Sequence, residues 1–309
     1  GFAHMSEGAL VVDVKEDTDT KEIPPCIILK SDGASLYSTT DLATLVMRMK
    51  ENNPDRVIYL ADARQSMHFI QVFRCARKTG IVPDTTELVH IGFGTMNGKD
   101  GKPFKTRDGG VMRLEYLLKE IDDEMLNKIK ENQKEKENLN IDEAEAEQTA
   151  KTVALAAVKY GDLSNQASKD YIFDIDRFTS FEGNTGPYIL YTIVRIKSIL
   201  SKYEAKGGDI SALKDAIMPA VNAGQKNLML SLAKFNATIE SAYEESAPHK
   251  ICAYIYELAN AFNGFYHDTK IISEENEELK KSYISLLVLT KEILEACIDM
   301  LGFSAPDRM

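Results

Sequence analysis

Residues 57–91 read VIYLADARQSMHFIQVFRCARKTGIVPDTTELVHI, and this segment decides the fold of the first part of the chain. Its two apolar runs, residues 57–60 and 88–91, are typical of buried strands. Residues 66–78 between them have helical spacing and end before Gly80, a residue that favours a helix C-terminus. Strand, helix and strand in this order predict a βαβ unit and therefore a parallel sheet. Sheets of this kind bind ligands beyond the carboxyl ends of their strands.

The sequence on both sides of this segment extends the prediction. Upstream, residues 27–29 predict a strand, and a helix follows from a cap at Thr39 or Thr40. Beyond residue 150 we find no strand pattern, so the sequence predicts an all-helical domain there. Its expected helices cover residues 149–160, 162–172, 188–203, 210–222, 226–245, 249–263 and 275–301.

The composition is typical of a soluble globular protein, with 309 residues of which 44% are hydrophobic and 28% charged. No apolar run is long enough to span a membrane, and no leader indicates secretion. The net charge is −11, but residues 68–107 and 186–230 are locally basic, so a nucleic-acid partner remains open. We expect a cytoplasmic protein with no metal site and reduced thiols, because its cysteines lack metal-binding spacing: Cys26, Cys75, Cys252 and Cys297.

A glycine-rich stretch, GFGTMNGKDGKPFKTRDGG, occupies residues 92–110 after the second strand. Its glycines match neither a dinucleotide fingerprint nor a P-loop, since no Gly-Lys-Ser/Thr ends it. The stretch carries the cations that a departing phosphate group needs: Lys99, Lys102, Lys105 and Arg107. The pattern fits a phosphate-binding loop and a solvated hairpin equally well.

Tyr37 and Asp41 stand four residues apart near the start of a predicted helix and therefore share one face. A carboxylate can bind a guanidinium group through two hydrogen bonds, and a tyrosine can stack on it. A place in the first helical turn, where the helix dipole favours an acid, is the simpler interpretation of Asp41. His68 has no Ser or Cys nucleophile beside it, so a structural histidine is its simpler interpretation. No Ser-His-Asp set, HExxH motif or close carboxylate pair supports a hydrolase.

Tyr188, Tyr191 and Arg195 combine aromatic rings and a cation on one predicted helix. This combination suits the stacking of unpaired bases with phosphate contacts nearby. Packing of the two tyrosines in the core is the alternative.

Four segments, in this order, together resemble arginyl-tRNA synthetases: SDGASLYSTTDLAT (31–44), YLADARQSMHFIQVF (59–73), HIGFGTMNGKDGKPFKTRDGG (90–110) and FTSFEGNTGPYILYT (178–192). The resemblance implies a class I aminoacyl-tRNA synthetase, which activates an amino acid with ATP and transfers it to the 3′ end of a tRNA. The implied fold is α/β plus all-α. A partial Rossmann-type parallel sheet is followed by an α-helical anticodon-binding bundle.

The resemblance also implies roles for residues of the α/β part. Tyr37 and Asp41 match positions that hold the arginine side chain, and Gln65 matches a third. The segment KPFKTR (102–107) is similar to the KMSKS signature, which steadies the ATP phosphates.

This chain departs from that signature, because Thr106 stands where the second lysine belongs. An upstream lysine is the expected substitute, and Lys99 and Lys102 are both candidates. Lys105 and Arg107 complete the expected catalytic set, while Thr106 and His68 are assigned to ATP, which carries Mg²⁺.

In the helical part, Tyr188 and Tyr191 match positions that face the anticodon loop, and Arg195 is assigned to the same surface. The closing segment APDRM resembles the family's C-terminus, which makes Met309 a further tRNA-binding candidate. The expected divisions are a cloning remnant, the second half of the catalytic domain with a charged linker, a helical connector and the anticodon-binding domain: residues 1–5, 6–148, 149–185 and 186–309.

No His-x-Gly-His motif occurs in the sequence, and no N-terminal tRNA-binding domain is recognised. We therefore expect a C-terminal portion of an arginine–tRNA ligase, with arginine, ATP and tRNA-Arg as ligands of the whole enzyme. We expect this chain to bind tRNA and to be inactive alone; the sequence does not determine the oligomeric state, for which we favour a monomer. The alternatives are a non-catalytic tRNA-binding module on a degenerate α/β base and a helical scaffold for protein partners.

Overall fold

The computed structural model describes residues 1–102, 113–135, 142–213 and 216–309. The chain forms two compact units. Unit 1 comprises residues 1–95 and 167–170, and unit 2 comprises residues 96–166 and 171–309.

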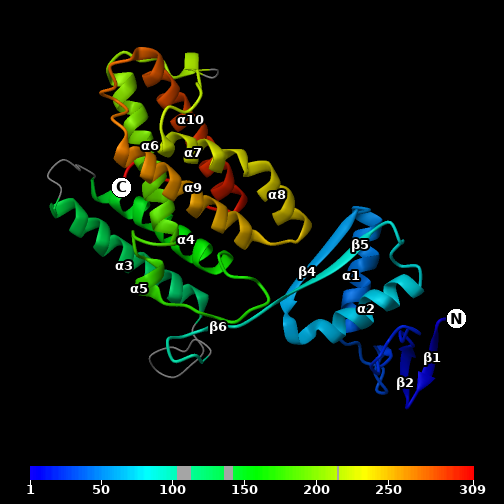
Figure 1. Ribbon diagram of the computed structural model, residues 1–309. Coiled ribbons are helices and arrows are strands. Elements are labelled where there is room, and N and C mark those ends of the chain that lie inside the picture. Colours follow the sequence, from blue (N-terminus) through cyan, green and yellow to red (C-terminus); the bar gives the residue numbers. More distant parts are fainter. Residues whose placement is uncertain (103–112, 136–141, 214–215) are drawn as a thin grey trace. The chain divides into compact units, whose positions relative to one another are not determined.

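Unit 1 contains two small sheets. In the first, β1 (Ala3–Ser6), β2 (Ala9–Val12) and β3 (Cys26–Leu29) are antiparallel in the order β1-β2-β3. In the second, β4 (Arg56–Asp62) and β5 (Glu87–Phe93) run parallel and side by side (Figure 1). The short 3₁₀ helix η1 (Ala63–Gln65) and the helix α2 (Ser66–Lys78) join β4 to β5. This arrangement confirms the predicted βαβ unit.

The core of unit 1 lies between α2 and the preceding helix α1 (Tyr37–Glu51). Leu45 of α1 and Val72 and Ala76 of α2 have no exposed surface. Burial of these apolar side chains is the main force that holds the two helices together. The contact brings the N-terminal turns of α1 and α2 within reach of each other, which positions the first candidate site.

One expectation about the strands of unit 1 is wrong. The strand over 27–29 does not join the parallel sheet, because β3 pairs antiparallel with β2. Ala3–Ser6 forms β1 and pairs with β2, so part of the segment assigned to a cloning remnant is a strand, and its assignment as a remnant stays a prediction. Short segments of this kind have little periodicity of their own, so tertiary pairing decides their structure.

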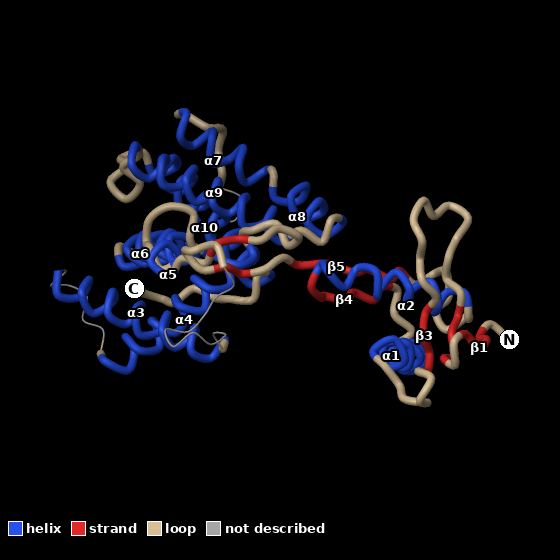
Figure 2. The backbone as a smooth tube through the Cα atoms, turned by 90° about the horizontal axis from the view of Figure 1, so that it is seen from below, coloured by secondary structure: helices blue, strands red, loops and turns tan. Residues whose placement is uncertain are grey.

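Unit 2 is helical apart from one short parallel pair, β6 (Met96–Asn97) with β7 (Tyr171–Ile172). Figure 2 shows its helices in blue. They are α3 (Leu114–Glu135), α4 (Glu143–Leu163), α5 (Ile175–Phe178), α6 (Gly186–Ala205), α7 (Ala223–Ala233), α8 (Phe235–Glu244), α9 (Pro248–Asp268) and α10 (Glu277–Met300), with the 3₁₀ helix η2 (Ser211–Leu213).

Polar caps and an apolar core explain these helices. The side chains of Thr185, Asn222 and Asn276 accept backbone N–H bonds at the starts of α6, α7 and α10. Ile189, Ile193 and Ile196 follow helical spacing along α6 and are fully buried. An α/β part followed by a helical part confirms the predicted fold class. Within the described residues, no helix has the length and apolar character to cross a membrane.

Two of the expected helices in unit 2, over 162–172 and 226–245, are wrong in part. Residues 164–170 are not helical, and Asn165 Nδ2 instead donates a 2.6 Å bond to the carbonyl oxygen of Gly161. The expected helix over 226–245 is divided at Lys234 into α7 and α8. β7 shows that a strand does occur beyond residue 150.

The expected helix over 210–222 is reduced to η2 in the described residues. Side chains of α10 bond two backbone groups of this segment. Ser282 Oγ accepts the Met218 N–H at 2.9 Å, and Ser285 Oγ donates to the Leu213 carbonyl at 2.7 Å. Because these backbone groups are satisfied by α10, the segment need not be helical.

Candidate functional site

The first candidate site begins at the N-terminus of α1. Thr39 Oγ1 donates a 2.6 Å hydrogen bond to the Ile28 carbonyl oxygen of β3, and Ser38 Oγ donates a hydrogen bond to the Ile27 carbonyl oxygen. These bonds start the helix at Tyr37, earlier than the predicted cap at Thr39 or Thr40. Asp41 therefore lies beyond the first turn, so the helix dipole does not explain it.

Asp41 instead contacts His68 of α2, with Asp41 Oδ2 2.7 Å from His68 Nε2. Each of the two side chains is 27% exposed. When Asp41 is ionised, the His68 Nε2–H donates this bond, which leaves Asp41 Oδ1 for a further donor. The contact agrees with the simpler interpretation of His68 as a hydrogen-bonded structural histidine, and it places His68 beside the residue assigned to arginine.

The other two residues predicted for arginine lie one helical turn from this pair. Tyr37 is 84% exposed in the first turn of α1, and Gln65 is exposed at the end of η1, directly before α2. Tyr37 lies four residues before Asp41 on α1, and Gln65 lies three residues before His68, so each shares a helix face with its partner. The carboxylate of Asp41 thus shares a helix face with an exposed aromatic ring, and the amide of Gln65 lies one turn before His68; such groups can bind a guanidinium ligand.

An aromatic layer under the site was missed by sequence reasoning. The Tyr59 ring of β4 contacts Phe69 of α2 at 5.0 Å, and the Arg48 guanidinium lies 5.2 Å from the Tyr59 ring centre. His90 of β5 stacks on Phe69 at 4.5 Å. Burial raises the pKa of Tyr59, so its hydroxyl stays neutral in this layer. The available signal was the placement of Tyr59 and His90 within strand patterns, where parallel pairing sets them side by side.

The glycine-rich stretch is partly described. A Cβ on Gly94 would lie 2.5 Å from the Lys169 carbonyl carbon, so Gly94 permits a close approach of two backbone segments. Residues 98–102, which we call the lysine turn, are closed by a 2.8 Å bond from the Gly98 N–H to the Lys102 carbonyl. Lys105, Thr106 and Arg107 lie outside the described residues.

The two candidate lysines of the lysine turn have different surroundings. Lys99 Nζ lies 3.0 Å from Asp174 Oδ1 and 2.8 Å from Asp176 Oδ2. The two carboxylates raise the pKa of Lys99, with Asp176 the stronger cause. Lys102 is exposed, and within the described part of the chain its ammonium group has no ion pair.

The second candidate site lies where α6 packs against α9. Tyr188 Oη contacts Asn260 Oδ1 at 2.7 Å, and Asn263 Nδ2 donates to Tyr188 Oη at 2.9 Å. Tyr188 also packs against the core, so the core alternative applies in part to Tyr188. The amide of Asn263 and the neighbouring Asn260 are polar groups of α9 that sequence reasoning missed.

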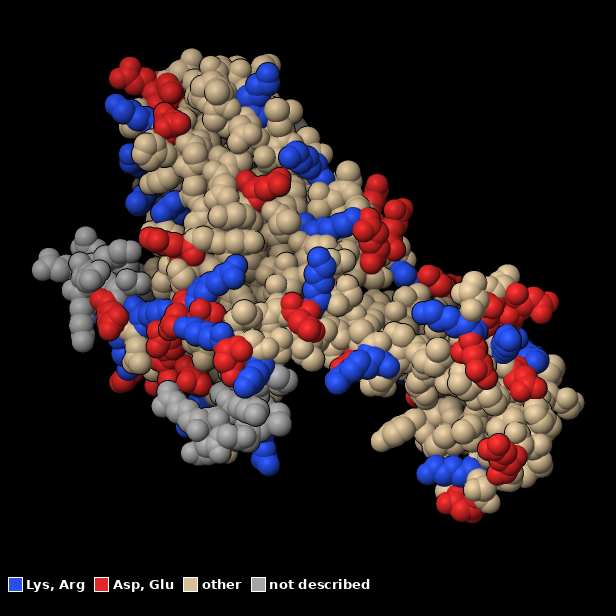
Figure 3. Space-filling model, turned by 60° about the horizontal axis from the view of Figure 1, so that its bottom comes forward, with Lys and Arg blue, Asp and Glu red and all other residues tan. Residues whose placement is uncertain are grey.

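Tyr191 and Arg195 are partly exposed on the same surface. The Arg195 guanidinium lies 4.7 Å from the Tyr191 ring centre and 5.4 Å from that of Tyr266 on α9. Two rings and a guanidinium form a surface on which a planar base can stack. On the face drawn in Figure 3, the basic side chains of unit 2 lie among acidic ones.

Met309 is partly buried against the core of unit 2. The residues before it are held by charged side chains of α4 and α6. Arg308 forms two hydrogen bonds with Glu145, and Lys197 Nζ lies 3.3 Å from Asp307 Oδ1. The C-terminal segment is thus fixed on the helical unit.

Comparisons with known families account for both parts of the chain. The model of the class I tRNA synthetases (R), catalytic domain, matches residues 1–175. The chain belongs to the arginyl-tRNA synthetase family. The model of the DALR anticodon binding domain matches residues 189–309, which is most of the helical part beyond the start of α6.

Curated relatives agree with this family. An arginine–tRNA ligase of Alkaliphilus oremlandii is 54% identical over 308 residues, which cover 100% of this chain and 51% of the relative. An arginine–tRNA ligase of Francisella tularensis is 43% identical over 310 residues, again with 100% and 51% coverage. The chain thus spans about half the length of the curated relatives it matches.

Solved structures share the fold. An arginyl-tRNA synthetase of Plasmodium falciparum matches with a TM-score of 0.81 and 26% identity, covering 100% of this chain and 50% of that one. One of Thermus thermophilus matches with a TM-score of 0.80 and 23% identity, covering 98% of this chain and 54% of that one.

In the described residues, no group of three or more His, Cys, Asp or Glu side chains could hold a metal ion.

Proposed function

We propose that the whole protein containing this chain is an arginine–tRNA ligase, which activates L-arginine with ATP and transfers it to tRNA-Arg. The observation that supports this most directly is the Asp41–His68 contact, with an exposed tyrosine one turn before Asp41 and an exposed glutamine three residues before His68. This grouping offers charge and shape to a guanidinium group.

In the proposed reaction, the residues of this chain bind and orient the substrates. The Asp41 carboxylate receives the guanidinium group, His68 holds that carboxylate in place, and Tyr37 forms a wall beside it. A lysine near the signature segment offsets charge on the ATP phosphates. Mg²⁺ enters as part of the nucleotide complex, and the phosphate oxygens are its natural ligands.

We further propose that this chain alone neither activates arginine nor charges tRNA, because it spans about half of its relatives. Catalysis by positioning needs groups on both sides of the reacting atoms. Charging of tRNA-Arg by the purified chain alone would contradict this proposal. The same chain would retain the tRNA-binding role of a non-catalytic module, which was the alternative interpretation of the sequence.

Binding to tRNA tests the role of the helical part. We expect the chain to bind tRNA-Arg more tightly than the same tRNA with an exchanged anticodon, when measured at two salt concentrations. Phosphate contacts weaken with salt for both tRNAs, whereas base contacts preserve the difference between them. Equal affinities that fall together with salt would mean that the helical part does not read the anticodon.

The substitution Tyr191→Ala is expected to weaken tRNA-Arg binding by about 1–3 kcal/mol, which is typical of one lost base stack. Its melting temperature should change little, since the Tyr191 side chain is partly exposed. Tyr243→Ala on α8 serves as the control, because Tyr243 is 71% exposed and lies on another helix. A large loss of melting temperature in Tyr191→Ala would identify Tyr191 as a core residue instead.

A further inference from the structure

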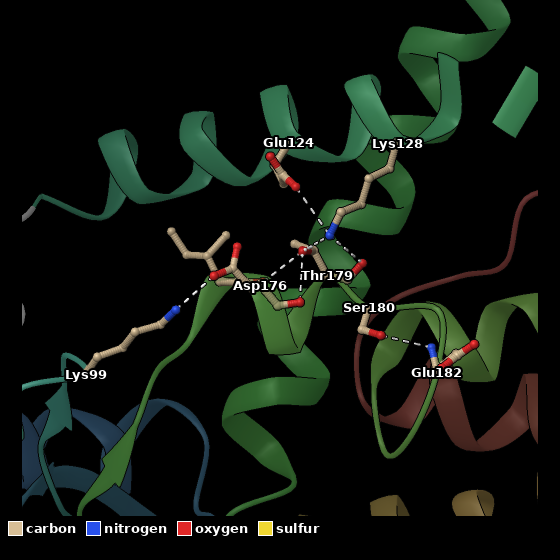
Figure 4. A network of polar contacts seen from close by, with 8 residues as sticks. Lys99, Glu124, Lys128, Asp176, Thr179, Ser180 and Glu182 are labelled. Atoms are coloured by element: carbon tan, nitrogen blue, oxygen red, sulfur yellow. Dashed lines mark hydrogen bonds and ion pairs between the residues drawn. The ribbon is translucent and has the colours of Figure 1, made fainter. Parts of the chain in front are cut away.

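Residues 174–179 form a platform that contacts the lysine turn, which belongs to the glycine-rich stretch, and helix α3, which follows that stretch. Figure 4 shows the contact of Lys99 with Asp176 and the contacts of Lys128 with Glu124 and Thr179. On the upstream side, Lys99 of the lysine turn makes ion pairs with Asp174 and Asp176 at 3.0 Å and 2.8 Å. Three donors on one ammonium group can serve two carboxylates at once.

On the downstream side, the platform holds helix α3. Lys128 Nζ of α3 donates a 2.7 Å hydrogen bond to Thr179 Oγ1 and lies 3.3 Å from Glu124 on the same helix. Thr179 is fully buried. The lysine turn and helix α3 are therefore both bonded to the same short piece of chain.

The platform itself is fixed by packing. Phe178 contacts Phe173 at a ring distance of 4.6 Å, and both rings are buried. Phe178 also lies against Gly161 of α4, where an added Cβ would come within 3.0 Å of the ring. The Phe173 N–H donates a 2.8 Å bond to the Asn97 carbonyl, directly before the lysine turn. These contacts give the lysine turn a rigid base.

Charge separates the roles of the two lysines. The positive charge of Lys99 is offset by Asp174 and Asp176, so the net charge at Lys99 attracts a triphosphate only weakly. Lys99 also holds the pKa of the Asp176 carboxyl below its usual range, which keeps the pair ionised. Lys102 shares the turn, is exposed, and has no ion pair among the described residues.

We propose that Asp174 and Asp176 position the lysine turn through Lys99, so that Lys102 is the lysine of this turn that meets the ATP phosphates. The inference rests on the proposed function, since it assigns roles within that reaction. Lys99, Asp174 and Asp176 are positioning residues in this assignment.

The test measures kcat and KM for ATP in tRNA charging by the complete synthetase that contains this chain. We expect Lys102→Gln to lower kcat/KM for ATP by about 100-fold, as the loss of one electrostatic contact to a reacting group does. Lys99→Gln and Asp176→Asn should each cost about tenfold through misplacement of the turn. Lys99→Arg, which keeps the ion pairs, should retain most of the activity of the unsubstituted protein.

Two comparisons make the test decisive. Lys99→Gln combined with Asp176→Asn should cost no more than the larger single loss, because both changes break the same contact. Lys130→Gln is the control, since Lys130 is another ion-paired lysine of unit 2, 3.6 Å from Glu143. All variants should melt within about 2 °C of the unsubstituted chain, because exposed ion pairs add little stability.

Two results would overturn the inference. One is a larger loss in Lys99→Gln than in Lys102→Gln, and the other is full activity of Asp176→Asn. Either result would mean that Lys99 meets the phosphates itself or that the platform does not position it. Failure of the unsubstituted protein to charge tRNA-Arg would refute the proposed function instead, so the two failures are distinguishable.

Discussion

The substitution Asp41→Asn is expected to lower kcat/KM for arginine by about 100-fold or more in the complete synthetase. An asparagine keeps the shape of the side chain but removes the charge that pairs with the guanidinium group. Loss of one partner of a charge pair typically costs about 2–5 kcal/mol, which sets this magnitude. The contact with His68 makes Asp41 well placed for this role, because it holds one carboxylate oxygen and leaves the other available.

The effect should be specific to arginine. KM for ATP is expected to change less than about threefold, since ATP carries no guanidinium group and its phosphates are assigned to another segment. Asp84→Asn is a matched control, because Asp84 is an exposed acid of unit 1 in the turn before β5. Equal losses in arginine and ATP use would contradict the assigned role of Asp41.

The substitution Gly186→Ala is expected to reduce the free energy of unfolding of the chain by roughly 3 kcal/mol or more. A Cβ at Gly186 would lie 2.3 Å from the carbonyl oxygen of Ala156 and 2.6 Å from its carbonyl carbon. These are backbone atoms of α4, so a change of rotamer does not relieve the overlap. The start of α6 and the middle of α4 must move apart, and this movement opens the core of unit 2.

Thermal unfolding followed by circular dichroism measures this effect. We expect a fall in melting temperature of about 10 °C for Gly186→Ala, given about 2–4 °C per kcal/mol for a domain of this size. Gly264→Ala is the control, because Gly264 lies within α9 and nothing is found within 4 Å of an added Cβ. This control should stabilise the chain by about 0.5–1 kcal/mol. Similar melting temperatures for the two variants would mean that α4 and α6 do not pack closely at Gly186.

Sequence reasoning succeeded where one segment contains its own signal. The helical spacing over 66–78 and the cap at Gly80 predicted α2 with the bounds that the structure has. The long helices α6, α9 and α10 were predicted for the same reason, since their apolar faces repeat over several turns. The helix predicted over 210–222 is wrong, and two of its backbone groups bond side chains of α10, which lie far away in the sequence.

Some residues of the candidate site were likewise predicted from local spacing, whereas their contacts were not. Tyr37 and Asp41 were identified from a spacing of four residues on one helix, and their roles stay predictions. That His68 touches Asp41 was not predictable from spacing, because the two residues are 27 positions apart and meet only through the packing of α1 on α2. The aromatic layer of Tyr59, Phe69 and His90 likewise requires the pairing of β4 with β5.

The sequence by itself determined the family resemblance, the βαβ unit and the helical character of the second part, because these depend on local periodicity and on long motifs. Only the tertiary structure separated Lys99 from Lys102. Both are lysines of one short turn, and the sequence treats them alike. The carboxylates that distinguish them lie more than 70 residues downstream, and they reach Lys99 only because β6 pairs with β7 and α5 packs on α4. Charge compensation depends on distance in space, which the order of residues does not contain.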